Sequence, residues 1–413
     1  MAPKMKTAQL LDHLRAVLAP QPQSPGPASV RIERDLRLDF FRGLSLFFIF
    51  IDHIPNNILS YGTLRAVGFS DAAEVFIFIS GYTAALVYGQ LWQRRGPVFA
   101  SVQIYHRVWQ LYVAHIFIFV IYTAEVSYAT MKLQTPAYSE QLRLNDFLRE
   151  PHVAIIKMLL LQYQPEFLDI LPLYIVLLAI FPLVVWLLSR RPLVAPALSL
   201  AIYLLTLYFG WEPKTYPDND GWFFNPFAWQ FLFVIGACAG YSQIASRPIF
   251  PRIPRLSRIA MAVVLIIVVI KLSWLLHSFT DLIPALFYDE LWTLADDKSD
   301  LSFLRLLSFF ALALTVVHFV KRDNKFLHHR LTRLVILCGQ HSLQVFCLGI
   351  LLSVLGRFIV TSISASIVTQ LAMNVGGIVL MIALAELMSW YKGKSRAAPA
   401  TPVPPGEYAT PSR

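Results

Sequence analysis

Residues 37–57 read RLDFFRGLSLFFIFIDHIPNN, an apolar stretch long enough to span a membrane that nevertheless contains Asp39, Arg42, Asp52 and His53. A charge inside a bilayer costs at least about 3 kcal/mol, so ionisable residues at that depth usually have a function. Arg42 and His53 are eleven positions apart, about three helical turns, and they therefore share one stripe of the predicted helix. The prediction of a membrane protein and the prediction of a functional site both start from this helix.

Two interpretations of this helix are open. Leu46 and Ile49 lie between Arg42 and His53, so an apolar track has a cation at one end and an imidazole at the other, with Asp39 about a quarter turn away. In one interpretation Arg42 extends to the membrane surface and His53 is a packing residue. In the other, Arg42 binds an anionic group and His53 takes up a proton from a hydroxyl, since an imidazole titrates near neutral pH.

The composition is that of a polytopic membrane protein. Of the 413 residues, 56% are hydrophobic and only 15% are charged. The net charge of +10 does not indicate a nucleic-acid partner, because the basic residues lie between apolar runs, where the positive-inside rule explains them. Cys238, Cys338 and Cys347 lie in apolar runs without a CxxC pair, so neither a disulfide framework nor a metal site is predicted.

The chain is predicted to be all-α, a bundle of about ten membrane-spanning helices with both termini in the cytoplasm. A short apolar run at 153–162 cannot span and is predicted to be a re-entrant or interfacial helix. The ten spans are predicted at 38–56, 71–91, 106–125, 168–189, 193–210, 226–244, 259–277, 302–320, 334–355 and 367–390.

The orientation follows from the loops. With the N-terminus inside, the inner segments contain 24 of the 35 Lys and Arg residues and the outer loops contain seven. Residues 1–33 are predicted to be a cytoplasmic extension with a Pro-rich linker, residues 34–392 the membrane domain, and residues 393–413 a disordered Pro-rich tail.

This topology places several polar residues near His53. Glu74, at the start of the second span, lies at a similar depth and can either orient the imidazole, as the acid of a catalytic triad does, or cap its own helix. Asp52 is the rival partner, although adjacent side chains on a helix point about 100° apart. Asn56 and Asn57 follow at the outer mouth, where a substrate would enter.

The outer loops and the basic residues leave further alternatives. The aromatic loop 211–231, with Trp222, Asn225 and Trp229, is either a set of membrane anchors or a platform for sugar rings. The acidic loop 278–301 is predicted to be a solvated face. Arg37 and Arg107 either enforce topology or join Arg42 in a phosphate site.

Five segments together resemble a known family: RLDFFRG, IDHIP, DAAEVFIFISGY, FNPFAWQ and LCGQHSLQVF. The arginine, ten intervening residues and a histidine in the first span resemble the acyltransferase type-3 superfamily of membrane enzymes. The fuller text is similar to its OpgC-like branch, which succinylates osmoregulated periplasmic glucans. The similarity covers about residues 34–391, hence all ten predicted spans.

The resemblance implies a bacterial inner-membrane acyltransferase with acyl-CoA, most simply succinyl-CoA, as co-substrate and a periplasmic glucan as acceptor. CoA phosphates would dock near Arg42, and His53 would activate a glucan hydroxyl. His341 lies in a family-like segment and is open to packing or a contact with the donor. The alternatives are transfer of acetyl or another acyl group to a different surface glycan and, in another class, a transporter or flippase. The sequence indicates no oligomeric state.

Overall fold

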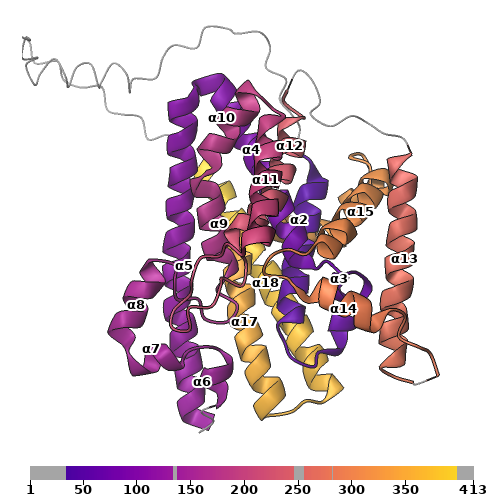
Figure 1. Cartoon of the computed structure of the whole chain (residues 1–413). Helices are drawn as coiled ribbons and strands as arrows, with labels where there is room; N and C mark the ends of the chain where they lie inside the picture. Colours follow the sequence, from indigo (N-terminus) through magenta and orange to yellow (C-terminus); the bar gives the residue numbers. More distant parts are fainter. Residues whose placement is uncertain (1–33, 134–136, 246–254, 281, 398–413) are drawn as a thin grey trace, which may run out of the picture. The chain divides into compact units, whose positions relative to one another are not determined.

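The structure, a computed structural model, describes residues 34–133, 137–245, 255–280 and 282–397. In these ranges the elements are seventeen α-helices and two short 3-10 helices, which confirms the all-α prediction (Figure 1). The predicted extension 1–33 lies outside the described residues. The tail predicted to be disordered begins at residue 393, but residues 393–397 continue the last helix, and the rest of the tail lies outside the described residues. The long or apolar helices are α2 (Leu36–Asp52), α4 (Ala72–Arg95), α5 (Pro97–Leu133), α9 (Ile170–Ala179), α10 (Phe181–Arg190), α11 (Val194–Phe209), α12 (Pro226–Tyr241), α13 (Leu256–His277), α15 (Phe303–Phe319), α16 (Arg330–Gln340), α17 (Ser342–Ser362) and α18 (Ile367–Ala397).

The remaining helices are short and belong to the connections. They are α3 (Leu64–Val67), α6 (Ala137–Gln141), α7 (Asn145–Arg149), α8 (Pro151–Leu159) and α14 (Tyr288–Asp296), with the 3-10 helices at Ile58–Gly62 and Lys325–His328. Helix α8 confirms that the apolar run near 153–162 is a short separate helix of nine residues. Its placement at or inside a membrane stays a prediction.

Each of the ten predicted spans coincides with a helix or with a pair of consecutive helices. Within the described residues, however, only α4, α5, α13, α17 and α18 are by themselves long and apolar enough to cross a membrane. A sixth span results if α9 and α10 are one span bent by 46°, at a break just before Pro182. The chain is therefore a multi-pass helical membrane protein, while ten spans and the orientation of the termini stay predictions.

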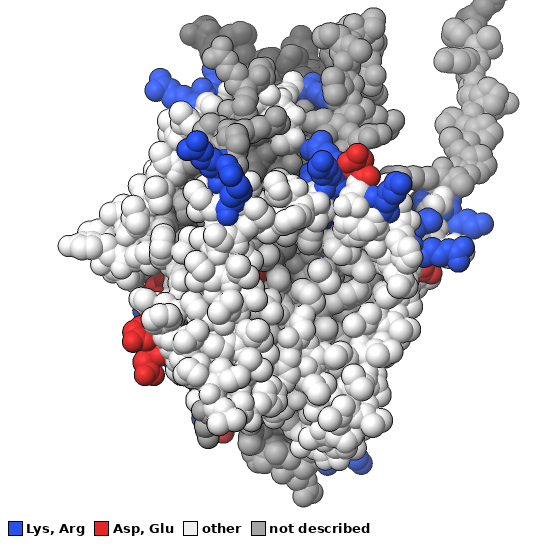
Figure 2. Space-filling view, turned by 90° about the vertical axis from the view of Figure 1, so that its right-hand side faces the viewer, with Lys and Arg blue, Asp and Glu red and all other residues white. Residues whose placement is uncertain are grey.

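The surface agrees with a membrane environment. Figure 2 shows Lys and Arg gathered near one end of the visible face and a broad uncharged surface beyond them. Large apolar side chains are exposed on the outward sides of the long helices, for example Leu265 at 64% and Val368 at 77%. Apolar area of this extent needs lipid or a partner to cover it.

Glycines let two helix pairs pack in close contact. On α4, a Cβ at Gly81 would collide with the carbonyl oxygen of Phe233 on α12, and one at Gly236 would collide with that of Phe78. Helices α2 and α16 meet in the same way at Gly43 and Gly339. Small residues at such crossings let backbones approach closely in membrane bundles. Glycines therefore determine how closely α4 packs on α12 and how closely α2 packs on α16.

Replacing Gly81 with alanine is expected to destabilise the protein by about 1–3 kcal/mol, because the added methyl forces α4 and α12 apart. Thermal unfolding in detergent measures this effect. Gly376→Ala is the matched control: Gly376 also lies in a helix, but a Cβ there meets nothing within 4 Å. Equal stability of the two variants would show that the α4–α12 crossing is looser than described.

Four helix ends bring loops together at one place. Helix α2 ends at Asp52, where the next backbone N–H, that of His53, still donates to Ile49 O at 3.2 Å. Helix α4 begins at a capping box in which Asp71 accepts from Ala73 N and Glu74 accepts from Asp71 N. Helices α9 and α12 begin after Asp169 and Asn225. The loops around these ends form the candidate site.

Candidate active site

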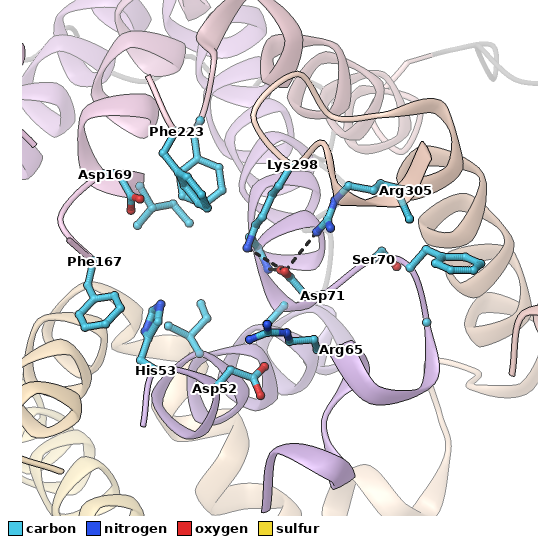
Figure 3. Close-up of a pocket in the computed structure, with 18 of the residues that line it drawn as sticks. Asp52, His53, Arg65, Ser70, Asp71, Phe167, Asp169, Phe223, Lys298 and Arg305 are labelled. Carbon is cyan, nitrogen blue, oxygen red and sulfur yellow. Dashed lines mark hydrogen bonds and ion pairs between the residues drawn. The ribbon is translucent and has the colours of Figure 1, made fainter. Parts of the chain in front are cut away.

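A cavity of about 550 Å³ lies where these helix ends meet. Its walls come from segments far apart in the sequence: the end of α2, the start of α4, the loop before α9, the loop before α12, helices α13, α14 and α17, and the segment from α14 to α15. Figure 3 shows charged groups around the open space. The charged lining residues are Asp52, Arg65, Asp71, Glu166, Asp169, Lys271, Lys298, Arg305 and Arg357.

His53 stands at the wall of this cavity. Its ring packs on Phe167 with 4.3 Å between centroids and an interplanar angle of 40°, and Figure 3 shows it directed into the space below Asp169. The Nδ1 atom is buried and has no hydrogen-bond partner among the described residues. Nε2 is therefore the nitrogen that can reach a substrate. The arrangement provides a positioned imidazole able to accept a proton from a bound hydroxyl.

Asp52 also lines the cavity but is oriented differently. Thr63 Oγ1 donates to its Oδ1 at 2.8 Å, which ties the carboxylate to the loop after α2. Figure 3 shows the two neighbouring side chains diverging, with Asp52 on the Arg65 side and His53 on the Phe167 side. This divergence is what the roughly 100° step along a helix predicts.

The alternatives for Glu74 are resolved in favour of the helix cap. Its Oε2 accepts from Asp71 N at 2.8 Å and its Oε1 accepts from Arg305 Nε at 2.7 Å. The side chain is 0% exposed, so both oxygens are used inside the protein. Glu74 thus holds the start of α4 and Arg305 rather than the imidazole.

Glu74 belongs to a four-residue charge cluster with Asp71, Lys298 and Arg305. Asp71 Oδ2 lies 2.7 Å from Lys298 Nζ and 3.1 Å from Arg305 Nη2 (Figure 3). Burial would raise the pKa of Asp71, but the two cations outweigh it and hold that pKa well below its ordinary value. Two cations and two carboxylates balance, and the cluster fixes the wall opposite His53.

Two further carboxyl groups, Glu166 and Asp169, line the cavity from the loop before α9. Burial and, to a smaller extent, the neighbouring Glu166 together raise the pKa of Asp169 to about 7. Burial also raises the pKa of Glu166. Near neutral pH Asp169 is therefore partly protonated, and its carboxyl group can both donate and accept hydrogen bonds.

The other predicted substrate residues have internal partners. Asn57 is buried and exchanges hydrogen bonds with Asn374 at 3.0 and 2.8 Å, whereas Asn56 is exposed with φ 52°. Asn225 caps α12 and donates to Asp300 Oδ1 at 2.7 Å. The nearby Trp222 and Trp229 are buried, and Trp229 donates to the carbonyls of Lys298 and Ser299.

The aromatic loop still reaches the cavity through other residues. Phe223 and Phe224 line it, while Trp229 holds the backbone of Lys298 behind them. The acidic loop 278–301 was predicted to be a solvated face, and its acidic side chains Asp289, Glu290 and Asp297 are exposed. Three other residues of this loop, Trp292, Ala295 and Lys298, line the cavity, and Lys298 forms an ion pair with Asp71 there.

The residues predicted to hold the donor lie apart from this cavity. Arg42 donates to Thr83 Oγ1 at 2.6 Å and to Ile79 O at 3.2 Å on α4, and Arg37 donates to Val320 O at 2.8 Å. His341 is buried at the break between α16 and α17. Gly339, two residues earlier, packs on the backbone of Asp39, so His341 belongs to the same end of α2 as Arg42.

Arg107, another predicted donor residue, is connected to the main cavity through shared lining residues. It lines a second, much smaller cavity of about 10 Å³ together with Tyr174 and Ser342. Ile170 and Phe346 line both cavities, and the Phe346 ring lies 6.3 Å from that of Phe76. Of the predicted track, Ile49 lines the main cavity and Leu46 is buried.

Most lining residues were not predicted, because they come from loops and helices that are distant in the sequence and meet only in the fold. A signal for them exists in the charge pattern. Eleven Lys and Arg residues fall outside the predicted inner segments, where the positive-inside rule does not account for them. Five of these line the cavity: Arg65, Lys271, Lys298, Arg305 and Arg357.

In the described part of the chain, no group of three or more His, Cys, Asp and Glu side chains is placed to hold a metal ion. The fold and the cavity define a multi-pass helical membrane protein with a large cavity lined by charged side chains. The chain matches the family model described as OpgC protein over residues 34–393, and it belongs to that family. Searches of curated proteins and of solved structures returned no match.

Proposed function

We propose that this protein is a membrane O-acyltransferase that transfers a succinyl group from succinyl-CoA to hydroxyl groups of a periplasmic glucan. The observation that carries the proposal is His53, which presents its imidazole to a large, charged cavity in a member of the OpgC family. A cavity of this size, with convergent polar groups, is what a small-molecule or saccharide site requires.

The chemistry needs one base and one leaving group. His53 Nε2 takes the proton of a glucan hydroxyl while that oxygen attacks the carbonyl carbon of the thioester. The C–S bond breaks, and the CoA thiolate receives the proton that His53 took up. The new ester leaves with the glucan, and His53 returns to its neutral form, so the step needs no further reactant.

The acceptor has suitable partners in the same cavity. Phe223, Phe224 and Trp292 offer ring faces for the C–H surface of sugars, and amphipathic sites of this kind combine apolar faces with polar groups. Glu166 and Asp169 offer oxygens for sugar hydroxyls. These residues take the place of Trp222 and Trp229 as the aromatic part of the acceptor site.

The donor enters from the opposite end of α2 in this proposal. Arg42, Arg107 and His341 belong to that end, and the small cavity at Arg107 shares Ile170 and Phe346 with the main cavity. The pantetheine arm would pass between these two residues to bring its thioester to His53. Arginine suits the phosphates at the entrance because its planar fork matches phosphate oxygens.

Replacing Arg42 with alanine is expected to raise the KM for succinyl-CoA about tenfold or more, with a smaller change in kcat, since a charge-assisted contact to the bound donor is lost. Steady-state kinetics on purified protein measures both constants. Arg94→Ala is the control, because Arg94 is exposed at the end of α4 and leaves the Thr83 contact intact. An unchanged KM in Arg42→Ala would remove the docking role.

Mass spectrometry of periplasmic glucans tests the function itself. Deleting the gene should remove succinyl substituents, and a plasmid copy should restore them. Loss of acetyl groups instead would assign a different donor. Unchanged glucans together with altered export of an unmodified solute would identify a transporter and reject the acyltransferase.

A further inference from the structure

The cations of the main cavity differ in whether they already have ionic partners. Lys298 and Arg305 are paired with Asp71 and Glu74. Lys271 packs over the rings of Phe69 and Trp274, at 5.8 and 5.0 Å from their centroids. These groups are held by the wall of the cavity, whereas Arg65, which is exposed, and Arg357, which is half-buried, have no ion pair among the described residues.

Arg357, on α17, is half-buried at the cavity wall and forms no ion pair with any residue the structure describes. Its Nε atom is buried without a hydrogen-bond partner among those residues. A guanidinium N–H that is removed from water and left without an acceptor is costly, so this position is suited to a ligand that supplies the acceptor.

Phe167 connects Arg357 to His53. The guanidinium carbon of Arg357 lies 5.4 Å from the centroid of the Phe167 ring, and the His53 ring lies 4.3 Å from the same centroid. Phe167 has φ 71°, a left-handed conformation that is unfavourable for a bulky residue and is typical of functional sites. One ring therefore holds both the base and the cation.

We infer that Arg357 binds the free carboxylate of an acidic acyl group and thereby selects a dicarboxylic donor over a neutral one. The inference rests on the proposed acyltransferase function. Three C–C bonds of about 1.5 Å each join the reacting carbonyl of a four-carbon diacid to its free carboxylate. A thioester held at His53 thus carries its free charge a few ångströms away, and Arg357 contacts the same Phe167 ring as His53.

The nearby acidic side chains do not neutralise the charge of Arg357. Glu166 precedes Phe167 in the chain and lines the same cavity, but it forms no ion pair with Arg357 in the described structure. Burial raises the pKa of Glu166, so its carboxyl group ionises less readily than usual. A carboxylate that arrives with the donor can replace it as the acceptor for the guanidinium fork.

Two donors of equal carbon number test the inference: succinyl-CoA and butyryl-CoA, which lacks the terminal charge. Arg357→Gln is expected to lower kcat/KM for succinyl-CoA at least about tenfold and to leave the value for butyryl-CoA within about threefold of wild type. Arg357→Lys keeps the charge but not the fork and should lose less with succinyl-CoA. Arg149→Gln removes an exposed arginine and is expected to change neither donor.

Four results would overturn the inference. Equal losses with both donors, in the glutamine and the lysine variants alike, would mean that Arg357 supports folding or catalysis in general. Unchanged kinetics would mean that no carboxylate is bound there. A loss that depends on whether the acceptor glucan is neutral or already succinylated would place the bound anion on the acceptor. Wild-type protein inactive with both donors would reject the proposed function itself, and the inference with it.

Discussion

Replacing His53 with alanine is expected to lower kcat for glucan acylation by about 10²- to 10⁴-fold, the usual contribution of a positioned general base. The structure explains why no neighbour replaces it. Asp52 is tied to Thr63, and both oxygens of Glu74 are engaged by Asp71 and Arg305. Initial rates at saturating donor and acceptor measure the effect.

A matched substitution separates chemistry from folding. His152 is exposed on α8, so His152→Ala should retain wild-type activity. The His53→Ala variant should also elute and unfold like the wild type, since the ring packs mainly on Phe167 at the cavity wall. A folded His53→Ala protein with undiminished kcat would remove the imidazole from the mechanism.

Replacing Arg305 with methionine is expected to destabilise the protein by about 3–5 kcal/mol, the range for removing one member of a buried ion pair. Glu74 is 0% exposed and lies 2.6 Å from Arg305 Nη2, so the substitution leaves a buried carboxylate without its cation. Thermal unfolding in detergent gives the apparent Tm, and the start of α4, which forms one wall of the cavity, should loosen first.

A second substitution identifies the cause. Adding Glu74→Gln to Arg305→Met removes the uncompensated charge and should restore a large part of the lost stability. The control Lys214→Met breaks the ion pair between Lys214 and Glu212, whose two side chains are 57% and 36% exposed respectively. This substitution should lower the free energy of unfolding by about 1 kcal/mol or less. If Arg305→Met were no more harmful than Lys214→Met, the cluster would not hold the cavity wall.

The fold was largely predictable because apolar runs and helix-ending residues are local signals. Helices lie at all ten predicted segments, and the short helix α8 lies near its expected position. The breaks inside spans were not predicted: α9 and α10 separate before Pro182, and α16 and α17 separate at His341. Neighbouring helices decide whether such a break forms, which hydropathy does not report.

The candidate site was predictable only in part. His53 and Asp52 were found because a charged residue in an apolar run is conspicuous. Glu166 and Phe167, in the loop before α9, and Arg357, on α17, were missed, since these segments approach His53 only in three dimensions. Asn57 and Asn225 were predicted to bind the substrate, but their side-chain amides form hydrogen bonds inside the protein.

Sealed vesicles with the protein inserted in one orientation test most directly whether the two substrates meet at His53 from opposite faces. Labelled succinyl-CoA is added outside, on the Arg42 end of α2, and the glucan is enclosed in the lumen. The account predicts labelled glucan inside, free CoA outside, and neither product with His53→Ala. Product formation only when both substrates share one compartment would contradict it.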